Sequence, residues 1–471
     1  MDEIWHVPMA YNYCAGNYSH WDEEVTTLPG VYALSMALLF VLGLFSSANL
    51  CTVYVLRSTN MLVGLGNWTV AYAIATKLAG PGAPRAKLVL VSAAVNSLPV
   101  LLSLTHVYYT DPGSVFFLLL MYLSYLYRRH WLAATFGAIA IFFRQSSVLW
   151  VAMTASSMLL DKLEASFQLQ RRDYEKNGVV NGVCNDVGNG VASGAANGVT
   201  KGAVNGITNG VINGIAHGCP DTTHDLPEHK EARVRIVWKR LVDDICATVK
   251  DSLGYVLVGV CFVAFLFYND GIVVGDRKHH QMCFHPPQMG YFLVFTLLHA
   301  APHMLKPSVV ADFANSVARR PLLYAVLGLV SVLGVQNHTH LHRYTLANNR
   351  HLTFHVWTHV LGKGPLVRFC LVPVYVYAGY ALLHRLGHTR LLWRVLFIAC
   401  TFAATSFHKM LEFRYFIVPY VFFRLHVKNE TYRELLLELI LNATVYCVML
   451  YMLLARTIVW NIDGSAQSFF W

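Results

Sequence analysis

A chain of 471 residues that is 55% hydrophobic and only 13% charged differs strongly from soluble domains, in which about a quarter of the residues are charged. The formal net charge of +10 would favour nucleic acid as the partner of a soluble protein, but here Lys and Arg fall mostly in short loops between apolar runs. Composition and charge therefore exclude a soluble fold, give no reason to expect nucleic acid, and predict an all-α, polytopic protein in a lipid bilayer.

Residues 1–30 form an acidic and aromatic segment. Two adjacent carboxylates and a histidine precede Pro8, and a second acidic stretch leads to Pro29 and Gly30; the two stretches read Met1-Asp2-Glu3-Ile4-Trp5-His6 and Trp21-Asp22-Glu23-Glu24. A signal peptide would instead show a basic start and an apolar core. From these residues alone, both a solvated terminus and a catalytic acid motif remain open, and the first is the simpler interpretation.

Apolar runs in residues 31–160 predict a first group of membrane helices. They cover 31–56, 61–79, 88–107, 114–127, 131–143 and 146–160. The positive-inside rule places the basic loops at Arg85 and Arg128 in the cytosol, which puts the Asp111 loop and Arg144 on the opposite side. By the same count, the run 31–56 is predicted to be one helix that lies along that far surface. An arginine with apolar neighbours on both sides, such as Arg144, either reaches the interface or pairs with an anion.

Residues 161–250 form a long hydrophilic stretch that the same rule places in the cytosol. Within it, Asn-Gly recurs between Asn177 and Asn213 without flanking strands of useful length. Such a composition buries too little apolar surface to offset the entropy of the chain, so we predict a disordered insert. A β-solenoid is the alternative.

Residues 251–471 contain a second group of apolar runs. They cover 253–269, 287–305, 321–336, 366–384, 391–407, 412–425 and 435–459, which brings the predicted total to about 12 spans. Polar clusters at 269–280, 337–357 and 406–416 fall on the same side as the acidic start, as does the glycosylation sequon at Asn17. The histidine-rich island 337–357 cannot lie in hydrocarbon, so it is predicted to meet a charged ligand at a watery cavity or at the membrane surface.

The ten cysteines are scattered without CxxC pairs, and several lie inside apolar runs: Cys261, Cys370, Cys400 and Cys447. We therefore predict that they are buried small side chains, with no sign of a disulfide framework or a zinc site.

Three histidines, His351, His355 and His359, recur every four residues and would share one helix face. A zinc site there is the alternative, but supporting Glu or Cys ligands are absent from the spacing. A hydrogen-bonded helix face is favoured, and no metal is expected.

Several blocks of the chain, in order along almost its whole length, resemble the dolichyl-phosphate-glucose α-1,2-glucosyltransferase family. They are Met1 to Pro8, Trp21 to Gly30, Phe143-Arg144-Gln145, Gly271 to Arg277, Asn349-Arg350-His351 through Trp357, and Glu412 to Phe416. Ordered agreement over many blocks is far more specific than any single motif. The Asn-Gly insert lies outside the resemblance.

The resemblance implies a GT-C-like multispan glycosyltransferase of the endoplasmic reticulum membrane, with a luminal active-site cleft. Members use dolichyl-phosphate-glucose to add the last, α-1,2-linked glucose to the diglucosylated lipid-linked oligosaccharide, the precursor for protein N-linked glycosylation. A β-linked donor and an α-linked product imply inversion in one displacement, without a cofactor. Another dolichyl-phosphate-sugar-dependent glycosyltransferase is the nearer alternative, and a polytopic transporter is the more distant one.

The resemblance and the chemistry of such a transfer together assign candidate site residues. The acceptor hydroxyl needs a base, and Asp2 is predicted, with Glu3 as the runner-up, because Asp2 matches the family's loop acid. Cations should meet the charge that grows on the departing phosphate. The predicted phosphate-binding residues are Arg350 and His351, followed by Arg144, Lys409 and Arg414. The predicted substrate-binding residues are Asn349, Trp357, Asp276 and Arg277.

The chain departs from the family pattern in two ways. Arg343 and Asn348 stand where the family has a proline and an aspartate, so no role of that aspartate carries over. The family pattern also has a membrane span before the acid motif, on which this chain begins. The whole prediction requires Asp2 and Arg350 to open onto one cavity on one side of the membrane.

Overall fold

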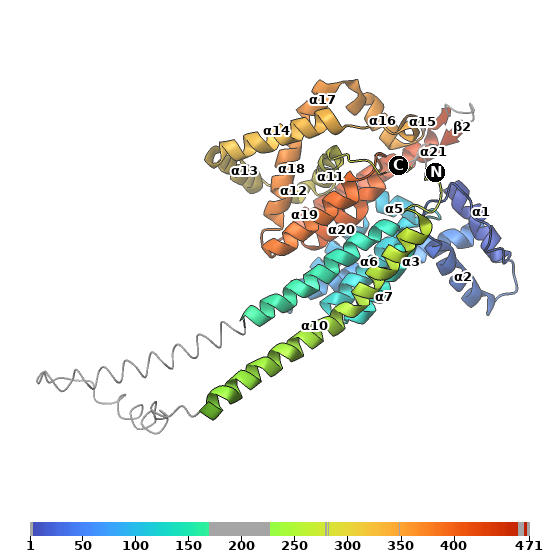
Figure 1. The fold of residues 1–471 in the computed structure, drawn as a ribbon. Coiled ribbons are helices and arrows are strands. Elements are labelled where there is room, and N and C mark those ends of the chain that lie inside the picture. The colour runs from blue at the N-terminus through green and yellow to red at the C-terminus, as the bar shows by residue number, and fades with distance from the viewer. Residues whose placement is uncertain are drawn as a thin grey trace, which may run out of the picture. The chain divides into compact units, whose positions relative to one another are not determined.

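The computed structural model describes residues 3–168, 227–277, 280, 282–347, 349–459 and 466–468. The described chain is almost entirely helical, and its two short strands, β1 (Thr457–Val459) and β2 (Ala466–Ser468), pair antiparallel (Figure 1). The prediction of an all-α protein is confirmed. The insert predicted between Asn177 and Asn213 lies outside the described residues, as do Asp2 and Asn348.

The chain divides into two units, Met1–Ser156 with Gly254–Trp471, and Ser157–Leu253. The elements before the insert are α1 (Glu3–Cys14), α2 (Gly30–Gly43), α3 (Val53–Ala79), α4 (Arg85–Asn96), α5 (Pro99–Thr105), α6 (Asp111–Leu126), α7 (His130–Phe143), the 3-10 turn η1 (Gln145–Ser147) and a helix described over 148–168.

The elements after the insert begin with α10 (Pro227–Asn269), α11 (Pro287–His299), α12 (Ala301–Met304), α13 (Pro307–Arg319) and α14 (Pro321–His338). They continue with α15 (Arg343–Ala347), α16 (Leu352–His359), η2 (Leu361–Lys363), α17 (Pro365–Cys370), α18 (Val372–Arg385), α19 (Leu391–Ser406), η3 (Phe413–Phe416), α20 (Ile417–Leu425) and α21 (Tyr432–Ala455).

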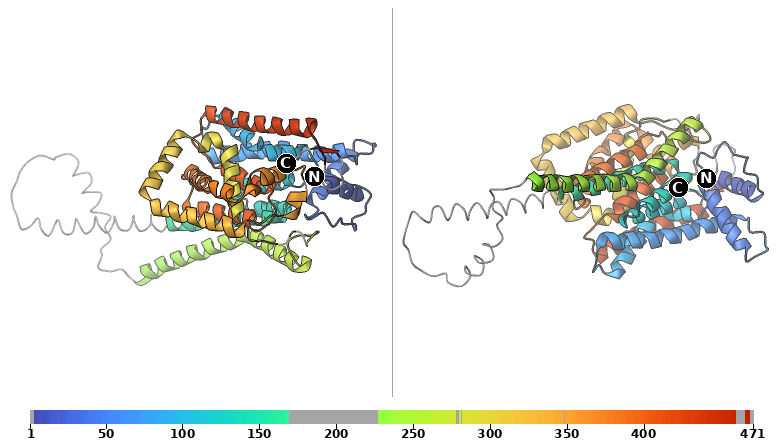
Figure 2. Two further views of the ribbon diagram at one scale, coloured as in Figure 1. Left: turned by 90° about the horizontal axis from the view of Figure 1, so that it is seen from above. Right: turned by 60° about the horizontal axis from the view of Figure 1, so that its bottom comes forward.

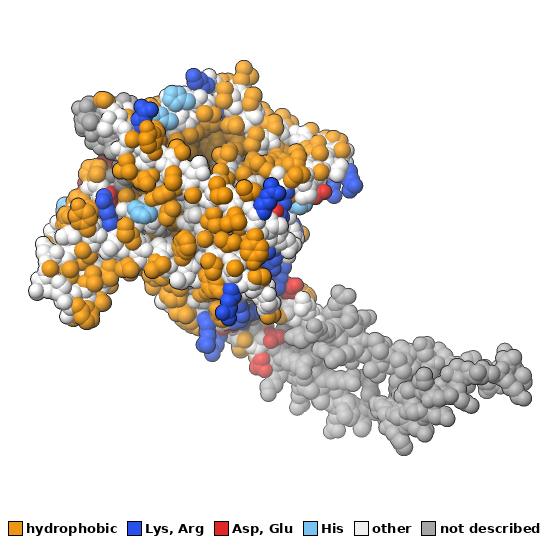
Figure 3. Space-filling model, turned by 180° about the vertical axis from the view of Figure 1, so that it is seen from behind, with side chains coloured by type: hydrophobic (Ala, Val, Ile, Leu, Met, Phe, Trp, Pro, Cys, Tyr) orange, Lys and Arg blue, Asp and Glu red, His pale blue; other side chains and the backbone are white. Residues whose placement is uncertain are grey.

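Among the described residues, four helical stretches are long and apolar enough to cross a membrane: Val242–Asn269, Pro321–His338, Pro365–Arg385 and Tyr432–Ala455. A fifth arises if the bent pair α4 and α5 is one span. Shorter apolar helices add to them, and Figure 3 shows hydrophobic side chains over much of one face, with few Lys and Arg among them. The chain is therefore a multi-pass membrane protein, while the total of about 12 spans stays a prediction.

The run 31–56, predicted as one helix, is divided in the structure into α2 and the start of α3. Short polar side chains make the break. Asn49 Oδ1 accepts the backbone N–H of Cys51 at 3.1 Å, and Thr52 Oγ1 accepts that of Val55 at 3.4 Å, which caps α3. Because the cap lies at Thr52, α3 also begins well before the predicted run 61–79.

Two other runs predicted as spans are interrupted. The run 88–107 bends by 77° between α4 and α5, where Pro99 lacks the N–H that would continue the first helix. The run 412–425 becomes η3 and the nine-residue α20, whose side chains are almost all buried in protein. At 1.5 Å per residue, α20 is only about 14 Å long, which is too short to span.

Helix α21 packs against N-terminal helices that are far from it in the sequence. Leu435 joins a hydrophobic cluster with Ala75 of α3 and Leu88 of α4, and Asn442 Nδ2 donates to Ser97 Oγ at 3.2 Å. The left view of Figure 2 shows this red helix beside the blue ones. Through this contact, helices from before and after the insert pack into one unit.

A buried charge cluster, formed by Arg424, Glu438, Glu430 and His303, joins α20 and α21 to α12. Arg424 Nε donates to Glu438 Oε1 at 2.7 Å and its Nη2 to Oε2 at 2.6 Å, while Glu430 pairs with the same guanidinium. His303 Nε2 lies 2.9 Å from Glu438 Oε2. All four side chains are at most 3% exposed, so the guanidinium and the carboxylates offset one another's charge in the protein interior.

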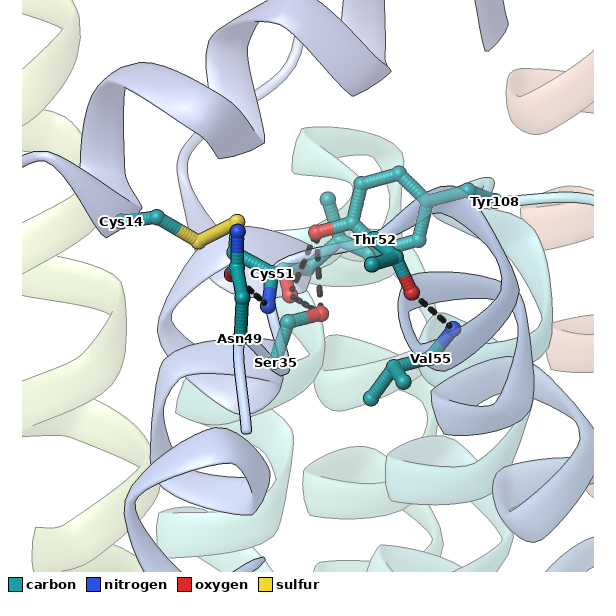
Figure 4. Close-up of a disulfide and its surroundings, with 8 residues drawn as sticks. Cys14, Ser35, Asn49, Cys51, Thr52, Val55 and Tyr108 are labelled. Atoms are coloured by element: carbon teal, nitrogen blue, oxygen red, sulfur yellow. Dashed lines mark hydrogen bonds between the residues drawn. A yellow bond between two sulfur atoms is a disulfide. The ribbon is translucent and has the colours of Figure 1, made fainter. Parts of the chain in front are cut away.

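Cys14, at the end of α1, and Cys51, just before α3, form a disulfide (Figure 4). The expectation of no disulfide is therefore wrong for this pair, which is 37 residues apart and carries no local spacing motif. Beside it, the hydroxyls of Ser35 and Tyr108 bond at 2.9 Å and tie α2 to the segment before α6.

The predicted burial of four other cysteines is also mostly wrong. Cys261, Cys370 and Cys447 are exposed on helix surfaces, and Cys400 is only partly buried. An apolar run in a membrane protein does not predict burial, because lipid accepts apolar side chains as readily as the protein interior does.

Removing the disulfide, as Cys14→Ser with Cys51→Ser, should lower the free energy of unfolding by about 3 kcal/mol, because a loop of this length is then no longer closed in the unfolded chain. The thermal midpoint in detergent is the measurement, with Cys261→Ser, on an exposed helix face, as the control. An unchanged midpoint in the double variant would contradict this expectation.

Candidate active site

A cavity of about 350 Å³ opens where the ends of several helices meet. Part of the lining is apolar and includes Leu149, Trp150 and Phe407. Other lining side chains are polar or charged: Thr26, Thr27, Asp111, Ser114, Arg144, Gln145, His280, His342, His408, Lys409, Arg414 and Tyr415. Such a cavity suits a ligand with an apolar chain at one end and an anionic or hydroxylated group at the other.

Arg144 is held at the cavity by a carboxylate and an aromatic ring. Helix α7 ends at Phe143, and the Arg144 side chain meets Asp111 at the start of α6, with Nη1 2.6 and 2.7 Å from the two carboxylate oxygens. Its guanidinium lies 5.3 Å from the centroid of the Tyr415 ring. Burial lowers the pKa of Arg144, but the charge of Asp111 and the nearby Tyr415 outweigh it, so the pKa is raised and Arg144 stays a cation.

Arg414 also packs against the Tyr415 ring. Its guanidinium is 5.5 Å from the Tyr415 ring centroid and 5.3 Å from that of Tyr109, and it pairs with Glu412. Burial, with the Glu412 charge, raises the pKa of Tyr415 to about 12, so its hydroxyl stays protonated. Arg144, Tyr415 and Arg414 together form what we call the arginine wall.

A smaller cavity of about 50 Å³ adjoins the arginine wall. The lining residues that the two cavities share are Thr26, Thr27, Arg144, His280, Arg414 and Tyr415. Trp5 and His6 of α1 line only the smaller cavity, as does Tyr109. The helix that begins at the acid motif therefore reaches the same arginines as the large cavity.

Glu3, the second candidate for the base, is held in a structural pair. Arg57 donates to its two oxygens from Nε and Nη2 at 2.8 and 2.7 Å, and the backbone N–H of Tyr108 donates to it at 2.8 Å. Glu3 thus ties α1 to α3 and to the segment before α6, and it lines neither of the two cavities. Asp2 lies outside the described residues, so its role stays a prediction.

Lys409 is presented to the cavity by a clamped loop. The fully buried Gln288 donates from Nε2 to the carbonyls of His408 and Met410, at 2.9 and 3.0 Å, on the two sides of Lys409. These bonds fix the backbone at Lys409 against the start of α11, and the Lys409 side chain lines the cavity.

Two histidines beside this loop are expected to make stability depend on pH. Burial, with His340 and His408 nearby, lowers the pKa of His285 to about 4, and burial with the charge of Arg144 lowers that of His408 to about 4. Between pH 6.5 and 4 the unfolded chain binds protons that the folded one does not, so stability should fall as the pH falls through this window.

The thermal midpoint in detergent, followed from pH 7 downwards, tests this expectation. His408→Gln should flatten the pH dependence relative to the unchanged chain, and so should His285→Gln. A midpoint that rises on acidification would contradict it.

Within the described part of the island 337–357, His342 lines the cavity, but the four predicted residues do not. Those four are Asn349, Arg350, His351 and Trp357. Asn349 Nδ2 donates to the carbonyl of Val459 at 2.8 Å. The Arg368 guanidinium lies 5.6 Å from the centroid of the buried Trp357 ring. Asn349 thus contacts β1 and Trp357 contacts α17, and neither lines the cavity.

Asp276 and Arg277 lie on the loop after α10, outside both cavity linings. Arg277 is exposed and bonds back to Asn269 Oδ1 at 2.9 Å. The Asp276 carboxylate accepts the Tyr344 hydroxyl at 3.0 Å and lies 3.4 Å from Nδ1 of His280, which lines both cavities. Asp276 therefore does not line a cavity itself, but it contacts His280, which does.

Among the described residues, no group of three or more His, Cys, Asp and Glu is arranged to hold a metal ion. His355 and His359 instead stack, with their ring centroids 5.8 Å apart. His355 Nε2 also bonds the carbonyl of Asn349 at 3.0 Å.

Sequence reasoning missed the acid that pairs with Arg144. Asp111 before Pro112 marks a helix start in the sequence, and nothing local relates it to an arginine 33 positions later. Tyr415 and His280 were missed as well. The signal for Tyr415 was its place inside the block from Glu412 to Phe416, and the signal for His280 was its place in the cation-rich loop after α10.

The model of the DIE2/ALG10 family matches residues 1–425 of the chain. The chain is also similar to proteins named Dol-P-Glc:Glc(2)Man(9)GlcNAc(2)-PP-Dol alpha-1,2-glucosyltransferase. One from Homo sapiens is 32% identical over 483 residues, and one from Mus musculus is 31% identical over 481; each alignment covers 100% of this chain and 93% of the relative. One from Arabidopsis thaliana is 29% identical over 493 residues, which covers 100% of this chain and 94% of the relative. No solved structure matches. The predicted resemblance is therefore confirmed, and the chain belongs to the DIE2/ALG10 family.

Proposed function

We propose that this chain transfers glucose from dolichyl-phosphate-glucose to the diglucosylated lipid-linked oligosaccharide and forms its terminal α-1,2 linkage. The names of full-length relatives describe this transfer for those proteins. In this chain, the observation that carries the proposal is the arginine wall, which lines both a large cavity with apolar and polar residues and a smaller one at helix α1. A dolichyl-phosphate-sugar has an apolar chain, an anion and a hydroxylated group, and these lining residues match all three.

The proposed reaction is a single inverting displacement. The acceptor's 2-hydroxyl oxygen attacks the anomeric carbon of the glucose, and the bond from that carbon to the phosphate oxygen breaks, with its electron pair leaving on the phosphate. A carboxylate takes the proton of the hydroxyl. We assign that role to Asp2, because the oxygens of Glu3 are engaged by Arg57.

Arg144, Arg414 and Lys409 are the proposed phosphate ligands, since all three line the large cavity. Their charges would stabilise the negative charge that develops on the departing dolichyl phosphate, because charge-assisted hydrogen bonds strengthen as that charge grows. The predicted roles of the remaining residues rest on the family resemblance alone, since these residues lie outside both cavity linings: Asn349, Arg350, His351, Trp357 and Arg277.

We propose the endoplasmic reticulum membrane as the location, with the cavities open to the lumen and the spans arranged as in GT-C enzymes. The disulfide between Cys14 and Cys51 supports this side, because disulfides form in oxidising compartments. The sequon residue Asn17 is exposed three positions after Cys14. Cys14 and Asn17 both lie shortly before the cavity residues Thr26 and Thr27 in the chain.

Incubating the purified full chain with dolichyl-phosphate-glucose and the diglucosylated oligosaccharide lipid tests the proposal. We expect one added glucose that an α-1,2-specific glucosidase removes. Transfer only from another dolichyl-phosphate-sugar, or only to another acceptor, would replace the proposal with the related glycosyltransferase. Absence of transfer together with movement of a substrate across vesicles would favour the transporter.

A further inference from the structure

The loop after α10, residues 270–277, packs closely against residues 23–27, of which Thr26 and Thr27 line both cavities. The backbone N–H of Asp276 donates to the carbonyl of Glu23 at 2.8 Å, and that of Val274 to Thr26 at 3.3 Å. At Gly275, a Cβ atom would lie 2.2 Å from the Glu23 carbonyl oxygen, so only glycine allows this approach. The position of Asp276 is therefore set by backbone contacts.

Asp276 also has a backbone conformation that is rare for a residue with a side chain, with φ +26°. Such conformations persist where the surrounding contacts enforce them, and they concentrate at functional sites. Here they aim the carboxylate at two groups, the hydroxyl of Tyr344 at 3.0 Å and the ring of His280. Burial, with the hydrogen bond to Asp276, raises the pKa of Tyr344 to about 12, so the tyrosine remains the donor.

The ring of His280 is anchored through one nitrogen. Nδ1 lies 3.1 Å from the Asp276 carbonyl oxygen and 3.4 Å from the Asp276 carboxylate, and both are acceptors, so Nδ1 carries a proton. Nε2 is then the nitrogen that a ligand can meet. His280 lines both cavities and thus stands where they join, beside the arginine wall.

The loop is also closed by contacts that do not involve His280. Arg277 already closes it, with Nε donating to the Val273 carbonyl at 3.3 Å and Nη2 to Asn269 Oδ1 at 2.9 Å. A carboxylate held this firmly beside one imidazole nitrogen orients the ring.

We propose that His280 is a catalytic residue of the glucose transfer and that Asp276 positions it; this inference rests on the proposed function. As the bond from the anomeric carbon to the phosphate oxygen breaks, the imidazolium donates its Nε2 proton to a phosphate oxygen. The base takes the proton of the acceptor hydroxyl, so the products are the glucosylated acceptor, singly charged dolichyl phosphate, the protonated base and neutral His280.

The charges around the site explain why an imidazolium helps there. Arg144 and Arg414 are each paired with a carboxylate, Asp111 and Glu412, which offsets part of the positive charge that they present to the leaving group. A protonated His280 adds one donor and one charge at the junction where the leaving group develops its own. The other groups near its ring are His342 and Tyr344, whose centroids are each 6.4 Å away.

The test compares His280→Gln, Asp276→Asn and their double variant with the unchanged full chain in lipid nanodiscs; His359→Gln is the matched control, because His359 is exposed outside both linings. We expect His280→Gln to lower kcat about 100-fold with a smaller effect on the donor KM. Asp276→Asn should cause a smaller loss, and the double variant should be no worse than His280→Gln, because Asp276 acts through the histidine. Losses that multiply, or a His280→Gln rate equal to that of the control, would overturn the inference.

A binding measurement separates this inference from the proposed function. His280→Gln should weaken binding of dolichyl phosphate about tenfold and leave binding of uncharged dolichol unchanged. If the unchanged chain transfers no glucose but shows this difference, the proposed function fails and the phosphate contact of His280 stands. If His280→Gln and the control bind dolichyl phosphate equally well, the proposed contact between His280 and the phosphate is wrong, whatever the transfer assay shows.

Discussion

Replacing Arg144 by glutamine should reduce glucose transfer at least about 100-fold, because the donor phosphate loses a charged ligand in the cavity. The same change strands the buried Asp111 without its cation, which should cost about 3 kcal/mol or more of stability. The measurements are kcat/KM for dolichyl-phosphate-glucose and the thermal midpoint in detergent.

A second substitution separates the two effects. Arg144→Gln with Asp111→Asn removes the stranded charge, so the thermal midpoint should return most of the way while transfer remains lost. Arg129→Gln, at an exposed arginine before α7, is the matched control and should change neither. Recovery of transfer in the double variant would show that Arg144 serves only to neutralise Asp111.

The largest loss of stability is expected in the charge cluster. Arg424→Met leaves Glu438 and Glu430 buried without the guanidinium that balances them, which should cost about 3–5 kcal/mol. Lower accumulation in membranes and a lower thermal midpoint are the observations to make. The donor KM of the protein that does fold should be unchanged, since the cluster lines neither cavity.

Arg433→Met is the control for the charge cluster, because this arginine is exposed on α21 and the substitution is the same. Removing a carboxylate as well, in Arg424→Met with Glu438→Leu, should recover part of the loss, since fewer buried charges are then unmatched. A midpoint for Arg424→Met equal to that of the control would mean that water reaches the cluster.

The apolar runs predicted the helices of the membrane part well where a run was bounded by charged loops, as for α14 and α21. They failed where polar capping residues or proline interrupted a run, because hydropathy averages over Thr52 and Pro99. They also failed at α20, since burial in protein and contact with lipid select the same apolar residues.

The chemistry of single residues predicted part of the candidate site, but contacts between distant segments could not be predicted from the sequence. An arginine between apolar residues needs an anionic partner, so Arg144 was predicted as a phosphate-binding residue. In the structure Arg144 lines one cavity with Lys409 and Arg414. Arg350 and His351 line neither cavity, so the expected meeting of Asp2 and Arg350 at one cavity is not found among the described residues. No periodicity in the sequence reports this. The partners Asp111 and His280 depend on contacts between distant loops, which a single sequence does not encode in any local pattern.

The disulfide closes a covalent ring that runs from Cys14 to Cys51 and contains Thr26 and Thr27, which line both cavities. A thiol reagent in an assay buffer would open this ring and loosen the cavity wall, although neither cysteine lines either cavity. Preparations made in a reducing cytosol, or kept in dithiothreitol, should therefore be less active than oxidised ones for a reason unrelated to any reactive thiol at the site.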